Sequence, residues 1–246
     1  MSWNPDQYER FRAERAQPFH DLTSLVEKRP AMRVVDLGCG TGELTRQLHE
    51  KLGAAETLGI DSSESMLAKA PAADGLRFER ANIETFTCDV LFDLIFSNAA
   101  LHWVPNHETL FARLATLLNE GGQLAVQMPA NDDHASHRIA GEVAERSFGI
   151  APRVHDVLPV ARYAELLHEL GFARQHVRLQ IYGHLLDETH GVVEWVKGTL
   201  LTDYQRRLGD RYAEFVQEYT ARLLEVLGDR RPYFYTYKRV LLWASR

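Results

Sequence analysis

The feature that most constrains this chain is a repeated alternation of short apolar runs and helical patterns between Met32 and Met128. The apolar runs predict strands at 32–37, 56–60, 76–80, 92–97 and 123–128. Helical patterns lie between them, at about 43–51, around 66–70 and along the leucines Leu110, Leu114, Leu117 and Leu118. This alternation is typical of a parallel sheet with helices on both faces, which binds ligands beyond the carboxyl ends of its strands.

After Pro129 the pattern becomes mostly helical. It predicts helices at 135–147, 160–170, 190–200 and 210–227, and two late strands at 175–186 and 234–243. We therefore expect an α/β fold with a doubly wound, mostly parallel, Rossmann-like sheet of seven strands, whose last strand is antiparallel. We expect one domain over 1–246, made of an N-terminal helical lid (1–30), a cofactor-binding core (31–130), a helical cap with a strand at about 175–186 (131–230) and a closing strand (231–246).

Composition favours a cytoplasmic enzyme with a small-molecule substrate. The formal net charge of −6 argues against a nucleic-acid partner, which favours a basic surface. The two cysteines, Cys39 and Cys88, are too few for a disulfide framework. No apolar stretch approaches the roughly 20 residues that span a bilayer, and the N-terminus lacks the apolar core of a secretory signal. We expect no membrane partner, and a monomer.

The turn after the first predicted strand, in "VVDLGCGTGE", carries three glycines. Gly38, Gly40 and Gly42 alternate with other residues, whereas the dinucleotide fingerprint is G-x-G-x-x-G. Asp36 and Glu43 add negative charge beside this turn, which disfavours a pyrophosphate and favours a cation. A nucleoside that carries an ammonium and a sulfonium, S-adenosylmethionine, satisfies both observations.

Two further strand ends carry polar residues. Asp61 ends the second strand, where a carboxylate accepts hydrogen bonds from ribose hydroxyls. Asn82 and Ile83 follow the third strand, where an amide and an aliphatic side chain can bracket an adenine ring. Asp61 alone also suits NAD, so the whole set of residues favours S-adenosylmethionine.

The segments "VVDLGCGTGELT", "LGIDSSESMLAKA" and "DLIFSNAALHW" resemble the motifs of class I S-adenosylmethionine-dependent methyltransferases. The resemblance covers about 33–128. It implies a cofactor site formed by Asp36, Gly38, Cys39, Gly40, Asp61, Ser62, Met66, Asn82, Ile83 and Asn98.

A narrower resemblance covers nearly the whole chain. "WNPDQYERFRAER", "LIFSNAALHWVPNHETLFARLATLLNEGGQLAVQMPAN" and "VVEWVKGT" are similar to the trans-aconitate 2-methyltransferase family, which converts one carboxylate of trans-aconitate into a methyl ester. The chain departs from that family at His102, where glutamine is frequent, and at Ala130, where aspartate is frequent. It has Leu200–Asp203 in place of "GLRP", and the missing arginine leaves the identity of the acid open.

A carboxylate acceptor is already ionised at neutral pH, so methyl transfer to it needs alignment and the exclusion of water but no general base. Basic, hydroxyl and aromatic groups should hold the acceptor. The candidates are Tyr8, Arg15, His102, Trp103, Gln127, Trp195, Tyr235 and Arg239. Arg15 and Arg239 rank first, because a guanidinium binds a carboxylate with two hydrogen bonds.

Several of these candidates have a plainer interpretation. Trp195 and Tyr235 suit the core of the cap, Arg239 suits a solvent-facing strand position, and His102 suits a packed loop. His134 and His137 lie near two aspartates, but no further ligand completes a familiar metal spacing, so we expect no metal.

Other functions stay open from the sequence. The acceptor could be a malonyl thioester or another small acid. It could also be a phenol or an amine, with His102 as the general base. Two further alternatives are an NAD-dependent oxidoreductase and a non-catalytic module that binds S-adenosylmethionine.

Overall fold

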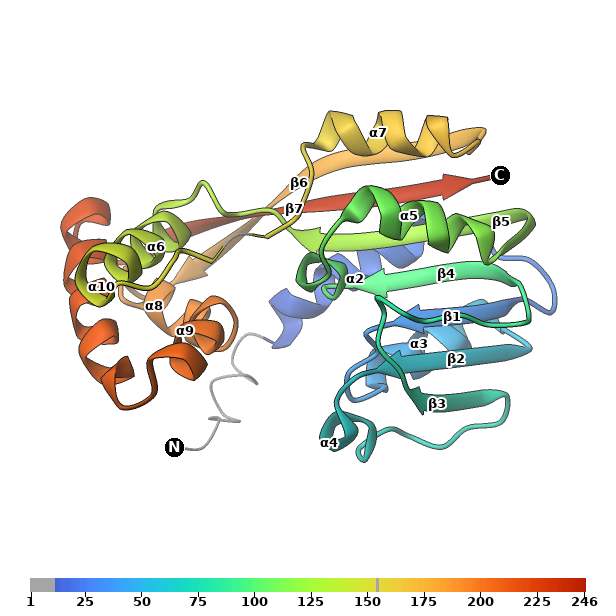
Figure 1. Cartoon of the computed structure of the whole chain (residues 1–246), viewed down its shortest axis with the longest axis horizontal. Coiled ribbons are helices and arrows are strands. Elements are labelled where there is room, and N and C mark those ends of the chain that lie inside the picture. Colours follow the sequence, from blue (N-terminus) through green and yellow to red (C-terminus); the bar gives the residue numbers. More distant parts are fainter. Residues whose placement is uncertain (1–11, 154) are drawn as a thin grey trace. The chain divides into compact units, whose positions relative to one another are not determined.

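The computed structural model describes residues 12–153 and 155–246, and side chains from Ala16 onward. The chain forms two compact units. The sheet unit comprises Arg15–Pro129, Asp156–Gln180 and Arg239–Arg246, and the helical unit is made mainly of Ala130–His155 and Ile181–Lys238. Figure 1 labels the elements of both.

Seven strands form one sheet, in the order β3-β2-β1-β4-β5-β7-β6. The strands are β1 (Arg33–Leu37), β2 (Glu56–Asp61), β3 (Leu76–Arg80), β4 (Phe92–Asn98), β5 (Leu118–Pro129), β6 (Arg174–Leu186) and β7 (Tyr233–Ser245). The first five pair in parallel, and β7 runs antiparallel to β5. The predicted seven-stranded, mostly parallel fold is therefore confirmed.

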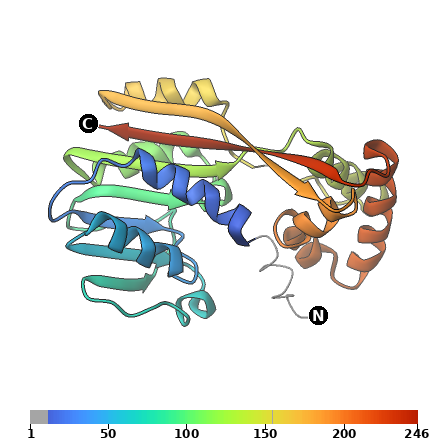
Figure 2. The same ribbon diagram turned by 180° about the vertical axis from the view of Figure 1, so that it is seen from behind.

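Helices cover both faces of the sheet unit. They are α2 (Arg12–Leu25), α3 (Glu43–Leu52), α4 (Glu64–Leu67), the 3-10 turn η1 (Leu101–Trp103), α5 (His107–Thr116) and α7 (Val160–Glu169). Figure 2 shows α2 and α3 on the face turned toward the viewer. There Phe19 and Leu22 of α2 pack in one core with Val34 and Phe96 of the sheet. On the other face, Phe111 of α5 packs against Tyr163 of α7.

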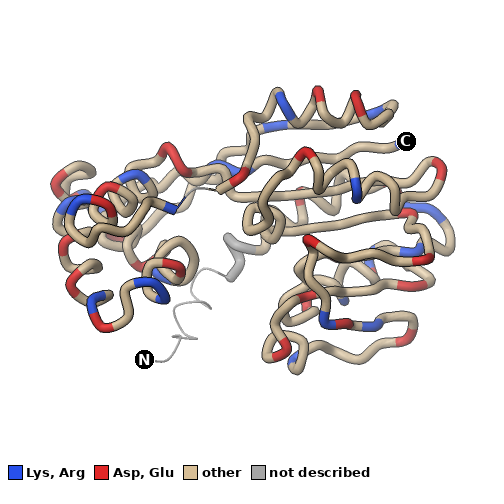
Figure 3. The backbone as a smooth tube through the Cα atoms, in the orientation of Figure 1, with Lys and Arg blue, Asp and Glu red and all other residues tan. Residues whose placement is uncertain are grey.

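The helical unit is organised around aromatic side chains. Its helices are α6 (Ala135–Phe148), α8 (Gly191–Lys197), α9 (Leu200–Leu208), η2 (Gly209–Arg211) and α10 (Tyr212–Leu227). Phe215 of α10 stacks on Tyr204 of α9, with ring centroids 5.1 Å apart, and meets Phe148 of α6 edge-on. Basic and acidic residues occur together along α9 and α10 (Figure 3), and Arg206 pairs with Asp203 at 2.7 Å.

Two predicted helices have different bounds. The helix predicted to reach Leu118 ends at Thr116, and Leu118 instead begins β5 by pairing with Phe92 of β4. The register then shifts, so the next pair joins Leu94 and Gln123. The helix predicted over 190–200 corresponds to α8, which ends at Lys197; after Gly198 and Thr199 a second helix, α9, begins at Leu200 and extends to Leu208, beyond the predicted range. Periodicity alone missed both breaks, because the apolar residues continue across them.

A fully buried glutamine joins β5 to its neighbours in the sheet unit. The Gln123 side-chain oxygen accepts from the indole N–H of Trp243 at 2.9 Å and from the backbone N–H of Glu27 at 2.8 Å. Its nitrogen donates to the carbonyl of Glu27 at 2.8 Å. One amide therefore fixes β7 and the segment after α2 to the centre of the sheet.

Replacing this amide by an apolar chain of similar length should destabilise the fold. We expect Gln123→Met to lower the free energy of unfolding by about 2–4 kcal/mol, because three buried polar groups lose their partner. Urea denaturation monitored by circular dichroism measures the change. Gln47→Met on α3, where the amide is partly exposed, is the control and should change stability by less than about 0.5 kcal/mol. Equal stabilities of the two variants would contradict the role of Gln123 in fixing β7 and the segment after α2 to the sheet.

Candidate active site

A cavity of about 370 Å³ lies at the carboxyl ends of β1, β2 and β4 in the sheet unit. Here the strand order reverses, because β2 lies on one side of β1 and β4 on the other. Its lining residues are Gly38, Asp61, Ser62, Ala81, Asn82, Ile83, Glu84, Ala99, Ala100, Trp103 and Val104. Five of the ten predicted cofactor residues, Gly38, Asp61, Ser62, Asn82 and Ile83, therefore meet around one cavity.

Gly38 allows the first turn to approach the fourth strand. Its φ of 78° lies in the left-handed region, and a Cβ at this position would lie 2.2 Å from the Cβ of Ala100. The N–H groups of Gly38 and Cys39 both donate to the carbonyl of Ile60, at 2.8 and 3.0 Å. The absence of a side chain at Gly38 is therefore a packing requirement of the cavity wall.

Asp61 holds the two loops that meet at the cavity. One carboxylate oxygen accepts from the Gly40 N–H at 2.9 Å, and the other accepts from the Ser63 N–H at 2.8 Å. Each oxygen keeps a lone pair for a further donor, and Asp61 itself lines the cavity. The carboxylate is therefore placed to receive the hydroxyls of a nucleoside.

Asp36 lies behind the glycine turn and is only 4% exposed. Its carboxylate accepts from the Thr45 hydroxyl at 2.6 Å. Burial raises the pKa of Asp36 to about 7, the Thr45 hydrogen bond lowers it, and nearby Asp61 raises it further. Asp36 is thus poised between its neutral and charged forms near neutral pH, and a cation in the cavity would favour the charged form.

The loop after β3 forms another wall of the cavity. The side-chain oxygen of Asn82 accepts from the Glu84 N–H at 2.9 Å. The Arg113 guanidinium, from α5, donates to the carbonyls of Ile83 and Phe86 at 2.6 and 2.5 Å. We did not predict Arg113 from the sequence, because a lone arginine on an amphipathic helix has the pattern of a solvated side chain.

Asn98 belongs to a buried polar chain that crosses three strands. With its amide nitrogen toward β4, Gln127 donates to the Asn98 side-chain oxygen at 2.8 Å and accepts from the Arg239 guanidinium at 2.9 Å. Gln127 is fully buried and Arg239 is 8% exposed. Arg239 therefore does not lie at the solvent-facing position that was its plainer interpretation, and Gln127 connects it to Asn98.

The turn η1 contains two residues that were predicted to hold the acceptor, and they differ in exposure. Trp103 is 53% exposed and lines the cavity, whereas His102 is 8% exposed.

His107, at the start of α5, donates from Nε2 to the Leu101 carbonyl at 2.9 Å and accepts at Nδ1 from the Tyr163 hydroxyl. Burial lowers the pKa of His107, which favours this neutral form. His107 was not predicted from the sequence either.

The other predicted cofactor residues occupy varied positions. Cys39 is buried and burial raises the pKa of its thiol, while Gly40 contacts Asp61 through its backbone. Met66 of α4 is 44% exposed and lies outside the cavity lining.

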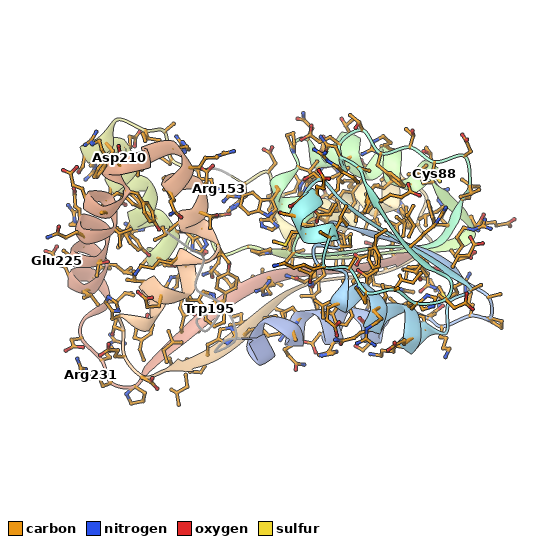
Figure 4. All side chains as sticks on the ribbon, turned by 90° about the horizontal axis from the view of Figure 1, so that it is seen from below. Cys88, Arg153, Trp195, Asp210, Glu225 and Arg231 are labelled. Atoms are coloured by element: carbon orange, nitrogen blue, oxygen red, sulfur yellow. The ribbon has the colours of Figure 1, made fainter. Side chains whose placement is uncertain are left out.

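Trp195 and Tyr235 lie in the core of the helical unit. Trp195 (Figure 4), on α8, is 1% exposed and stacks on His184, with ring centroids 4.3 Å apart. Tyr235 is fully buried, and its hydroxyl lies 3.2 Å from that of Ser136. Both positions agree with the plainer interpretation of cap core. Tyr8 lies outside the described residues, and of Arg15 only the backbone in α2 is described.

The described residues offer neither a metal site nor a membrane-spanning helix. Among residues 12–153 and 155–246, no group of three or more His, Cys, Asp or Glu side chains is arranged to hold a metal ion. In the same ranges, no helix combines the length and apolar character needed to cross a membrane.

Comparison with known proteins agrees with this geometry. Residues 28–165 match the methyltransferase domain family. The trans-aconitate 2-methyltransferase of Deinococcus radiodurans is 45% identical over 100% of this chain and 99% of its own, and that of Variovorax paradoxus is 40% identical over 91% and 89%. The crystal structure of the YcgJ protein from Bacillus subtilis superposes with a TM-score of 0.63 at 14% identity, over 94% of this chain and 98% of its own.

The match to the domain family covers more than half of the chain, and the two enzymes named above align along nearly all of it. The structural likeness, at low identity, independently supports the Rossmann-like fold. The chain therefore belongs to the trans-aconitate 2-methyltransferase family of S-adenosylmethionine-dependent methyltransferases.

Proposed function

We propose that this protein transfers the methyl group of S-adenosylmethionine to one carboxylate of trans-aconitate. The observation that carries the proposal is the 45% identity, along the whole chain, to a relative named trans-aconitate 2-methyltransferase. The cavity formed by Gly38, Asp61 and Ile83 supports it, since it offers a carboxylate and an apolar wall to a nucleoside.

The proposed step is an in-line displacement at the methyl carbon. A carboxylate oxygen of the acceptor forms the new O–C bond, the S–C bond breaks, and its electron pair stays on sulfur. The products are a methyl ester and S-adenosylhomocysteine, and no proton is transferred. The protein's task is to align the two reactants and to keep water out.

Within the cofactor site, we propose that Asp61 receives the ribose hydroxyls and that Asn82 and Ile83 border the adenine. Asp36 ends β1 two residues before the glycine turn, so we assign it to the cationic methionine part of the cofactor. For the acceptor, we propose Arg239 as a carboxylate ligand, because Gln127 and the flanking strands hold its guanidinium at the end of β5. Tyr8 and Arg15 stay predictions.

The burial of His102 supports a carboxylate over an acceptor that needs a general base. A phenol or an amine needs a general base, and His102 was the residue proposed for that role. The side chain that lines the cavity is that of its neighbour Trp103. We therefore keep the carboxylate acceptor. A single-domain organisation, a monomeric state and a cytoplasmic location stay predictions from the sequence.

The acceptor is tested by measuring S-adenosylhomocysteine release with trans-aconitate, cis-aconitate, citrate and a malonyl thioester. We expect turnover with trans-aconitate and at least about tenfold lower kcat/KM with the other acids. Faster turnover of the malonyl thioester would contradict the acceptor assignment.

Arg239→Lys should reduce kcat/KM for trans-aconitate about 30-fold or more, because a lysine cannot form two parallel bonds to a carboxylate. The affinity of this variant for S-adenosylhomocysteine should stay unchanged.

The pKa of Asp36 predicts a pH dependence of cofactor binding. The cationic cofactor favours the charged carboxylate, so affinity for S-adenosylmethionine should rise between pH 5.5 and 7.5 and fall about tenfold per unit well below the pKa of about 7. Isothermal titration calorimetry measures this slope. Asp36→Asn should bind more weakly at pH 7.5 and with no such slope.

The same substitution has an opposite effect on the stability of the unliganded protein. Because the folded-state pKa of Asp36 is raised above the unfolded value, stability is lost as pH rises from about 4 through 7. Asp36→Asn should therefore be as stable as the natural protein at pH 3.5, slightly more stable at pH 5, and more stable at pH 7.5 by up to about 4 kcal/mol. A variant that is destabilised at pH 7.5 would show that Asp36 is structural.

A further inference from the structure

We infer that helix α5 is the positioning element of the cofactor cavity, and that Arg113 on this helix sets the shape of the wall that receives the nucleoside. The inference rests on S-adenosylmethionine as the cofactor, but it does not depend on the identity of the acceptor. Arg113 itself is absent from the cavity lining, so it acts through the loop that it holds.

The loop after β3 has few backbone partners of its own. β3 is the edge strand of the sheet, and the chain leaves it at Arg80 and returns to the sheet only at Phe92 (Figure 1). Within this segment, Ala81 donates to the Asp61 carbonyl and Thr85 donates to the Asn82 carbonyl. The wall that contains Asn82, Ile83 and Glu84 is therefore a loop that belongs to no strand of the sheet.

Arg113 holds this loop by hydrogen bonds to its backbone. Its two terminal nitrogens donate to two carbonyls of the same loop, Nη2 to Ile83 at 2.6 Å and Nη1 to Phe86 at 2.5 Å. The side chain of Ile83 faces the cavity while its carbonyl is held by Arg113. Phe86 is buried beside Phe92, with ring centroids 6.4 Å apart. The fork of a guanidinium fits two carbonyls at once, whereas an ammonium is a single point charge.

The same helix also holds the turn before it, which contributes Trp103 to the cavity. His107, six positions earlier on α5, fixes the carbonyl of Leu101 and is itself fixed by Tyr163 of α7. The Tyr163 hydroxyl also accepts from the Leu158 N–H at 3.1 Å. Leu101 begins the turn that carries Trp103, which lines the cavity. Two polar side chains of one helix thus hold backbone carbonyls of two segments that line the cavity.

The test uses Arg113→Gln, Arg113→Lys and matched controls at Arg207. Arg207 of α9 also donates to a backbone carbonyl, that of Ala151 at 2.8 Å, and it lies in the helical unit. S-adenosylhomocysteine and adenosine are titrated calorimetrically into each variant, and thermal unfolding is recorded in parallel. These titrations need no acceptor, so the result stands apart from the test of the methylated acid.

We expect Arg113→Gln to bind both ligands about tenfold more weakly, because the wall that contacts adenosine is no longer held. Arg113→Lys should recover part of that loss, and Arg207→Gln and Arg207→Lys should bind within twofold of the natural protein. With any acceptor that is turned over, the KM for S-adenosylmethionine should rise in Arg113→Lys while kcat stays within twofold.

Unchanged affinity in a folded Arg113→Gln variant would overturn the inference. Equal losses of affinity in the Arg113 and Arg207 variants would also overturn it, because the effect would then follow stability and not the wall of the cavity. If Arg113→Gln does not fold, Arg113→Lys decides the question by the same titrations.

Discussion

The carboxylate of Asp61 is the interaction on which the candidate site depends. It ends β2 and accepts one N–H from the glycine turn after β1 and one from the turn after β2. The parallel register places Leu37 beside Ile60, so these two turns begin at the same level of the sheet. One side chain therefore connects two loops where they diverge, and the cavity lies between these loops and the end of β4.

The site is built in two layers. The residues that line the cavity lie at strand ends and in the loops that follow them. Behind them lie Arg113, His107 and Gln127, each of which bonds to groups on another element. This arrangement fits a reaction that needs no base. When the acceptor is already ionised, the rate depends on the alignment of the sulfur, the methyl carbon and the acceptor oxygen. That alignment depends on how firmly the walls of the cavity are held.

Much of the sheet unit could be predicted from the sequence, because the strand pattern and the polar residues at strand ends are local signals. The positions of Gly38, Asp61 and Asn82 follow from a rule about parallel sheets, and they were predicted to lie together. Arg113 and His107 could not be found in this way. On helix α5 each has the pattern of an ordinary polar residue, and only the path of the loop after β3 and the packing of α7 give it a partner.

Other details of the structure also depend on long-range contacts. Gln127 was predicted at the acceptor because it ends a central strand; in the structure it lies between Asn98 and Arg239, and its role toward the acceptor stays a prediction. The helix was predicted to reach Leu118, which is too far. The leucines continue into β5, and their spacing does not show that Leu118 pairs with Phe92 of β4. These features depend on contacts between residues far apart in the sequence, and a short segment does not show which residues will be in contact.

The most direct test of the account is the affinity of the Asp61→Asn variant for S-adenosylhomocysteine. Glu56→Gln, at the other end of β2, is the matched control, because Glu56 is exposed and pairs with Arg33. Calorimetry should show binding about 100-fold weaker in Asp61→Asn, with thermal unfolding still cooperative, and unchanged binding in Glu56→Gln. If folded Asp61→Asn bound S-adenosylhomocysteine as tightly as the natural protein, the cofactor site proposed for the ends of β1 and β2 would be wrong.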